Sequence, residues 1–143
     1  LRQASFKYNG KADNFVRELP RVCEIHFALP PDCFEYFLIT LSFGKEQIRL
    51  SYNEESNEIC IDRNNMLLGG RGKRYIPINR QDDFNFTLFI DKSIMEMYSQ
   101  NGFAAATWVY YPAEENLPYI RISSGKNICF NLDVYELGQI SYR

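Results

Sequence analysis

The chain has 143 residues and a mass of 16.8 kDa, with 16 basic and 18 acidic side chains and a formal net charge of −2. Its 45% hydrophobic and 15% aromatic content excludes intrinsic disorder, and no apolar run reaches the roughly 20 residues of a membrane-spanning helix. The charge balance excludes a broad cationic field, so we expect neither nucleic acid nor a membrane as a partner. The length suits one domain, 1–143.

Apolar and polar residues alternate along the chain with the two-residue period of β-strands. Residues 3–8 are expected to form the first strand. In segment 23–29 the apolar side chains fall on one face, and Glu24 and His26 fall on the other. The same alternation recurs in segments 48–52, 59–61, 84–90, 120–122 and 128–134.

Turn-forming residues separate these segments at Asn9-Gly10, 30–32, Gly44-Lys45, 53–57, 69–72, Asn101-Gly102 and 124–126. Asn-Gly between two strand-like runs is a strong hairpin signal. Residues 104–106 are helix-like, but they lead into the β-branched and aromatic run TWVYY, which favours a strand. Together these patterns predict an all-β fold of about a dozen strands, a two-sheet antiparallel β-sandwich of the jelly-roll or concanavalin-like lectin type.

The four cysteines, Cys23, Cys33, Cys60 and Cys129, are widely spaced and form no C-x-x-C pair, which argues against a zinc site. An even number permits two disulfides, but three of the four fall inside predicted strands, so buried or half-buried free thiols are favoured. The chain begins at Leu1 without Met or a leader, and we expect it to be part of a longer, cytoplasmic protein.

Two features contain residue types that often form catalytic or ligand-binding sites. For both of them, a structural interpretation is favoured over a functional one. The lone His26 has no adjacent Cys or His with which to form a metal site or triad, so a solvated surface position is expected. Segment 69–74 (GGRGKR) resembles a phosphate-binding loop. However, Leu67 stands where that motif needs Gly, and Arg74 stands where it needs Ser or Thr. A solvated hairpin turn is expected there.

Acidic side chains offer a catalytic alternative. Asp62-Arg63 closes one predicted strand, and Asp91-Lys92-Ser93 turns into the strand that carries Glu96. A glycosidase needs two carboxyl groups about 5 to 10 Å apart, and Asp91 and Glu96 could approach each other across a tight turn. However, an acid–cation–Ser tripeptide also builds turns, because Asp accepts backbone N–H groups. We favour the structural interpretation.

Aromatic residues supply a further candidate. Trp108 and Tyr110 share one face of a predicted strand, and Tyr111, Tyr119 and Tyr98 are expected nearby. The apolar face of a sugar ring stacks on such rings, yet aromatic residues also fill the core of an ordinary sandwich. The aromatic pattern does not separate these two interpretations.

One stretch is more specific. Segment 86–98 (FTLFIDKSIMEMY), Asn101-Gly102 and segment 107–112 (TWVYYP) closely resemble the C-terminal β-sandwich of glycoside hydrolase family 32, which includes invertases, fructanases and sucrose-6-phosphate hydrolases. Segments 58–63 and 132–137 also suit strands of that module. Lys92 stands where Arg is usual and Tyr98 where Phe is usual. Lys lacks the bidentate fork of Arg, so we expect looser pairing within the turn.

The resemblance implies that catalysis takes place elsewhere. The family's catalytic carboxylates lie in an N-terminal five-bladed propeller, and none of its Trp-x-Asn-Asp-Pro, Arg-Asp-Pro and Glu-Cys motifs occurs here. Asp91 and Glu96 match the structural turn of the sandwich instead. The resemblance implies a non-catalytic module, without cofactor or metal, that stabilises the propeller of an enzyme acting on sucrose, sucrose 6-phosphate or a fructan. Among these substrates, the cysteines and the missing leader favour sucrose 6-phosphate, because they suit a cytosolic enzyme. It also allows a homodimer, and sugar or interdomain contacts through Trp108, Tyr110 and Tyr111. A carbohydrate (fructan)-binding module is the alternative.

Overall fold

The computed structural model describes residues 2–30, 33, 37–43, 45–65, 72–79, 84–91, 94–99, 104–109 and 118–138, which form ten antiparallel strands and, within these ranges, no α-helix. The strands are β1 (Arg2–Glu18), β2 (Cys23–Leu29), β3 (Leu38–Phe43), β4 (Glu46–Asn53), β5 (Glu58–Asn65), β6 (Lys73–Pro77), β7 (Phe84–Asp91), β8 (Ile94–Ser99), β9 (Ala104–Val109) and β10 (Tyr119–Leu137). The predicted all-β class is confirmed.

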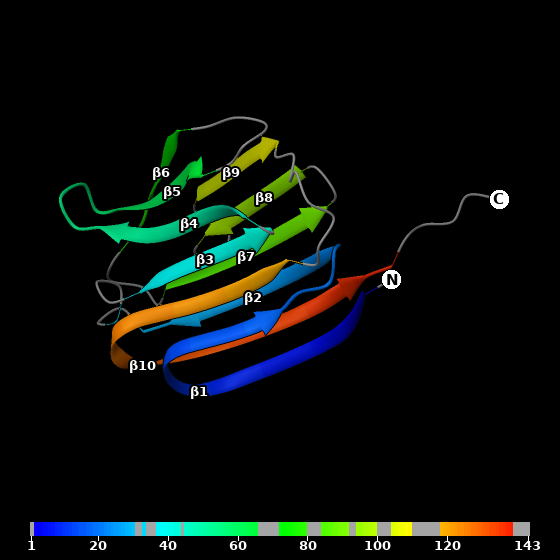
Figure 1. Ribbon diagram of the computed structural model, residues 1–143. Helices are drawn as coiled ribbons and strands as arrows, with labels where there is room; N and C mark the ends of the chain where they lie inside the picture. The colour runs from blue at the N-terminus through cyan, green and yellow to red at the C-terminus, as the bar shows by residue number, and fades with distance from the viewer. Residues whose placement is uncertain are drawn as a thin grey trace.

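The strands form two layers that share two long strands, β1 and β10 (Figure 1). Residues 119–123 of β10 pair with β3, whereas residues 131–136 pair with β2, and β1 follows β10 along both parts. The strand order is β6-β5-β4-β3-β10-β2-β7-β8-β9, and the sheet bends at β10, so that the strands on either side of β10 in this order lie in different layers. We call the layer that contains β3 to β6 sheet I, and the layer that contains β2 and β7 to β9 sheet II. The predicted two-sheet sandwich is confirmed.

Two of the predicted turns are bends within strands. Asn9-Gly10 lies inside β1, and residues 124–126 lie inside β10. The pairing of β1 with β10 shifts register between Ala12 and Asn14, and such a shift bends a strand without ending it. The Lys126 amide N–H also donates to the Ser124 hydroxyl oxygen at 3.0 Å. The prediction of turns at these two places is therefore wrong, because each strand continues through its bend.

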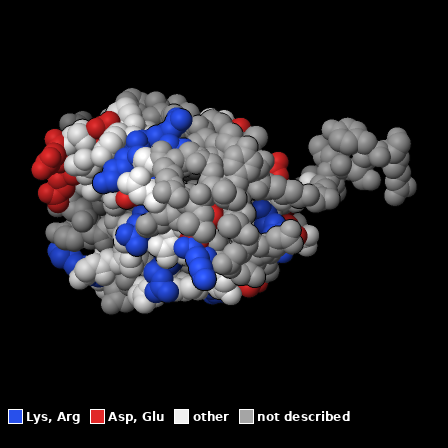
Figure 2. Space-filling model, turned by 45° about the horizontal axis from the view of Figure 1, so that its top comes forward, with Lys and Arg blue, Asp and Glu red and all other residues white. Residues whose placement is uncertain are grey.

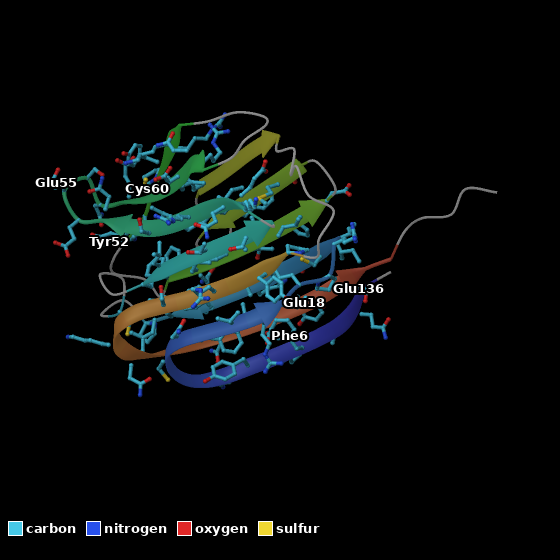
Figure 3. The ribbon with its side chains drawn as sticks, viewed as in Figure 1. Phe6, Glu18, Tyr52, Glu55, Cys60 and Glu136 are labelled. Atoms are coloured by element: carbon cyan, nitrogen blue, oxygen red, sulfur yellow. The ribbon has the colours of Figure 1, made fainter. Side chains whose placement is uncertain are left out.

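The turn between β4 and β5 lies where it was predicted, and side chains hold it in place. Asn57 has a left-handed φ of 55°, a conformation that Asn tolerates better than most residues. Its side chain donates to the Ile78 carbonyl at 3.1 Å and accepts from the Tyr52 hydroxyl at 2.8 Å. Figure 3 shows Tyr52 and Glu55 at this end of the molecule, with Glu55 pointing outward. Four other predicted turns, at 30–32, Gly44-Lys45, 69–72 and Asn101-Gly102, lie partly or wholly outside the described residues, which lack 31–32, 44, 69–71 and 101–102.

The alternation predicted from the sequence becomes the core between the sheets. The inward side chains of β2, β4, β5, β7 and the last part of β10 are buried, as period-2 patterning requires. Phe27, which is 1% exposed, lies in the middle of an aromatic cluster. Its ring centroid is 5.3 Å from that of Phe86, 5.7 Å from that of Phe130 and 6.5 Å from that of Phe84. This cluster joins β2, β7 and β10 within sheet II.

The cysteines are free thiols in the structure, as expected. Cys23 is buried, and burial raises the pKa of its thiol to about 12, so it stays protonated. Cys33 and Cys60 are half-buried. Cys129 is exposed on β10, where a half-buried position was expected, because its side chain points to the outward face of the sheet.

Replacing Phe27 by Ala is expected to lower the free energy of unfolding by about 3 to 5 kcal/mol, because the substitution removes buried surface and leaves a cavity among the neighbouring aromatic rings. Urea unfolding followed by circular dichroism measures the change. Tyr75→Ala is the control, because Tyr75 is 45% exposed on β6. Equal losses for the two variants would contradict the placement of Phe27 at the centre of the core.

Candidate functional site

The outward face of sheet II carries polar side chains in rows that the strand register sets. His26 on β2 lies opposite Asp133 on β10 and Thr87 on β7. In the neighbouring row, Ala28 lies between Asn131 and Asn85. Because the alternate residues of these strands fill the core, the polar residues face outward together.

His26 is held by three side chains. Its Nε2 contacts the Glu24 carboxylate, its Nδ1 lies 3.4 Å from the Thr87 hydroxyl oxygen, and its ring meets the Tyr135 ring edge-on at 5.5 Å. Glu24 is only 7% exposed, and the His26 side chain is 39% exposed. In the neutral ring, Nε2 donates to the carboxylate and Nδ1 accepts from the hydroxyl.

The expectation of a solvated surface histidine was therefore wrong in part. His26 lies on the polar face as predicted, but the ring is half-buried and oriented by its neighbours. The Glu two residues earlier on the same strand face was the one sequence signal of this pairing. Thr87 and Tyr135 are distant in sequence, so their approach depends on the strand order.

The sheet is hollowed beside His26. A hollow of about 190 Å³ over β10, β2 and β7 is lined by His26, Phe27, Ala28, Asn85, Phe86, Thr87, Asn131 and Asp133. The small side chain of Ala28 leaves space that the longer side chains on either side enclose. A second hollow of about 180 Å³ shares Ala28 and Asn131 with the first and extends to Asn9 and Pro30. The two hollows adjoin along one polar face.

The two carboxylates proposed as a catalytic alternative also lie on the outward face of sheet II. Asp91 is exposed at the end of β7, Glu96 is half-buried on β8, and both line a third hollow of about 270 Å³. The Tyr98 hydroxyl donates to a Glu96 carboxylate oxygen at 3.1 Å. Lys92 and Ser93, which complete the predicted turn motif, lie outside the described residues.

Asp62 and Arg63 lie on β5 in sheet I, on the other layer of the sandwich. The Asn64 amide N–H donates to an Asp62 carboxylate oxygen at 2.9 Å, and the Arg63 amide N–H donates to the Gly72 carbonyl at 2.9 Å. Burial, followed by repulsion from the Arg74 guanidinium, lowers the pKa of Arg63. The two Asp-containing motifs are therefore not brought together in one site.

Of the aromatic candidates Trp108, Tyr110 and Tyr111, the structure describes the backbone of Trp108. Trp108 lies on β9, with its backbone opposite Met95 of β8, and its side chain lies outside the described part of the structure. Tyr110 and Tyr111 lie outside it altogether. Tyr119, one of the tyrosines expected near these residues, is 45% exposed on β10, and its hydroxyl donates to Glu18 at 3.3 Å.

Charged side chains of both signs are spread over the described surface, and they do not form a metal site there. Figure 2 shows Lys and Arg side chains in several separate groups on one face, with one group of Asp and Glu side chains at its left edge and others scattered over the same face. Among the described residues, no three His, Cys, Asp or Glu side chains are arranged to hold a metal ion. In that same part of the chain, no helix has the length and apolarity needed to span a membrane.

A two-sheet antiparallel sandwich whose layers share a bent strand pair defines the class of this protein as a β-sandwich module. Residues 21–136 match the family described as "Glycosyl hydrolases family 32 C terminal". Since the match covers most of the chain, the chain belongs to this family. No curated protein matches the sequence.

Solved structures of larger enzymes share the fold. An exo-inulinase from Aspergillus awamori superposes with a TM-score of 0.73 at 15% identity, over 97% of this chain and 29% of its own. A β-fructofuranosidase from Schwanniomyces occidentalis gives 0.73 at 15% identity, over 96% and 34%. A sucrose-6-phosphate hydrolase from Lactobacillus gasseri gives 0.63 at 14% identity, over 90% and 28%. The chain thus spans about a third of these enzymes, and the likeness concerns the fold.

Glu96 raises the pKa of Tyr98, first because its carboxylate accepts the phenolic hydrogen bond and then because its charge opposes that of the phenolate. Glu96→Gln is therefore expected to shift the titration of Tyr98 to lower pH. Carbon-13 NMR of labelled tyrosine measures this shift, with the remaining tyrosine resonances as internal reference. An unchanged Tyr98 titration would show that the contact does not form in solution.

Proposed function

We propose that this chain is the non-catalytic β-sandwich module of an enzyme that cleaves sucrose or fructans, and that it stabilises the five-bladed propeller of that enzyme. The family match over residues 21–136 carries the proposal. The inulinase and fructofuranosidase that share its fold are about three times longer than the matched region, which supports a role as one part of a larger chain.

Exposed aromatic side chains support a contact with another domain. Tyr75 on β6 and Tyr119 on β10 are each 45% exposed on sheet I, and Tyr98 on β8 is 38% exposed on sheet II. Tyrosine is enriched in protein interfaces because its ring buries a large area while its hydroxyl stays hydrogen-bonded. A homodimer would use the same chemistry, and sedimentation of the chain over a range of concentrations distinguishes it from a monomer.

The substrate that we propose for the parent enzyme is sucrose 6-phosphate, and the compartment is the cytoplasm. The sucrose-6-phosphate hydrolase from Lactobacillus gasseri supports the substrate by its shared fold, and the free thiols support a reducing compartment. A fructan-binding module is the second candidate, favoured by the polar outward face of sheet II.

The coding sequence upstream of Leu1 tests the proposal. We expect it to encode a propeller with an Asp nucleophile and a Glu acid–base residue, and we expect the full enzyme to release fructose more efficiently from sucrose 6-phosphate than from sucrose or inulin. The 143-residue chain alone is expected to release none. Release of fructose by this chain, abolished by Glu96→Gln, would instead identify an independent hydrolase.

We assign a structural role to Asp91, Lys92, Ser93 and Glu96, and to Asp62-Arg63. The hydrogen bond from the Asn64 amide N–H to Asp62 is a contact of the kind that this role requires. Removing an acidic acceptor from a turn costs about 1 kcal/mol by analogy with a helix cap.

Asp91→Ala is therefore expected to lower the free energy of unfolding by about 1 kcal/mol without changing fructose release by the full enzyme. Chemical denaturation and an activity assay measure the two effects. Glu55→Ala is the matched control, because Glu55 is an exposed acid in a different turn. Stability equal to that of the control variant would argue against the turn role, and a loss of activity at unchanged stability would indicate a role in the active site.

A further inference from the structure

We propose that the hollow beside His26 on the outward face of sheet II binds one ring of a polyhydroxylated ligand, such as a monosaccharide or the terminal unit of an oligosaccharide. The site is separate from the hollow that Asp91 and Glu96 line. It goes beyond the structural role proposed above and deepens the second, fructan-binding candidate by naming the residues and the ligand class of the site. It does not depend on which enzyme the chain belongs to.

The polar groups around the hollow match the chemistry of a sugar. Each sugar hydroxyl both donates and accepts, so a site for it needs donors and acceptors side by side. Asn85 and Asn131 carry amides on opposite sides of Ala28, and Asp133 adds a carboxylate that accepts only. Asn131 is exposed and Asp133 is half-buried, so both side chains reach solvent at the hollow. They remain available to a ligand.

The site is also rigid. All of its polar residues lie on β10, β2 and β7, three neighbouring strands near the middle of the sheet, and not on loops. Contacts with Glu24, Thr87 and Tyr135 already orient the His26 ring before a ligand binds. Preorganised groups on regular strands bind with a smaller loss of conformational entropy.

The size of the hollow limits the ligand. At about 190 Å³ it lies below the range of roughly 300 to 1,000 Å³ typical of sites for drug-sized molecules, so it suits a single ring. The adjoining hollow of about 180 Å³, reached past Ala28 and Asn131, gives room for a second unit along the same face. We therefore expect free monosaccharides to bind weakly, in the millimolar range.

The same residues do not support covalent catalysis. Thr87, His26 and Glu24 form a hydroxyl–imidazole–carboxylate series, which resembles the order of a hydrolytic triad. However, Thr87 lies in the middle of β7, between the paired strands β2 and β8, where the sheet ladder engages the backbone N–H groups. Hydrolysis through an acyl intermediate would need unpaired N–H groups that donate to the negatively charged oxygen of the reacting carbonyl group. Binding is the chemistry that this arrangement supports.

Titration of the 143-residue chain with fructose, glucose, galactose and sucrose, followed by proton–nitrogen NMR, tests the proposal. At least one of these sugars should produce saturable shifts in the side-chain amide signals of Asn85 and Asn131. Ala28→Leu fills the hollow and should weaken that binding at least tenfold. Ala4→Leu is the matched control, because Ala4 is exposed on β1 and lines neither hollow, and it should leave the affinity unchanged.

Asn131→Ala gives a second measurement if Ala28→Leu fails to fold, and it should weaken binding several-fold while thermal unfolding stays cooperative. Three results would overturn the proposal: no saturable shift with any of the four sugars, shifts that avoid both amides, or equal affinity in Ala28→Leu and Ala4→Leu. The structural role in a larger enzyme would survive each of them, because its test lies in the coding sequence upstream of Leu1.

Discussion

The antiparallel pairing of β1 with β10 is the interaction on which the whole fold depends. Both strands pass from sheet I to sheet II, and their pairing continues on either side of a register shift near Ala12. Since β3 and β2 pair with different parts of β10, the two sheets face each other only because this strand bends. The core, the outward faces and the hollows all follow from that geometry.

Strand order also determines which polar groups meet on the outward face. His26 belongs to β2, Thr87 to β7 and Asp133 to β10. His26 and Thr87 are 61 residues apart in the sequence, and they meet because β2 and β7 are paired. The period of the strands directs all three outward, and the register aligns them in one row. Because the same three strands carry the aromatic cluster around Phe27 on their inward side, the site has a well-packed layer beneath it.

The observed positions of particular residues show which structural features the sequence predicts correctly and which it does not. Period-2 patterning correctly placed Ile25, Phe27 and Leu88 in the core, because a strand that covers a core has one apolar side. Reading Gly10 and Gly125 as ends of strands was wrong, since glycine permits a bend as readily as a reversal and only the pairing partner decides between them. For His26 the sequence supplied the direction of the side chain and the nearby Glu24, but not Thr87 or Tyr135.

By itself the sequence determined the all-β class, the inward and outward faces of the strands, and a family resemblance concentrated in residues 86–112. These properties are local, because they depend on alternation and turn chemistry over a few neighbouring residues. Only the tertiary structure decided that β1 and β10 belong to both sheets, that Asp62 and Asp91 lie on different layers, and that Asn85 and Asn131 flank Ala28. Those outcomes depend on long-range hydrogen bonding between strands, which leaves no signal in local periodicity.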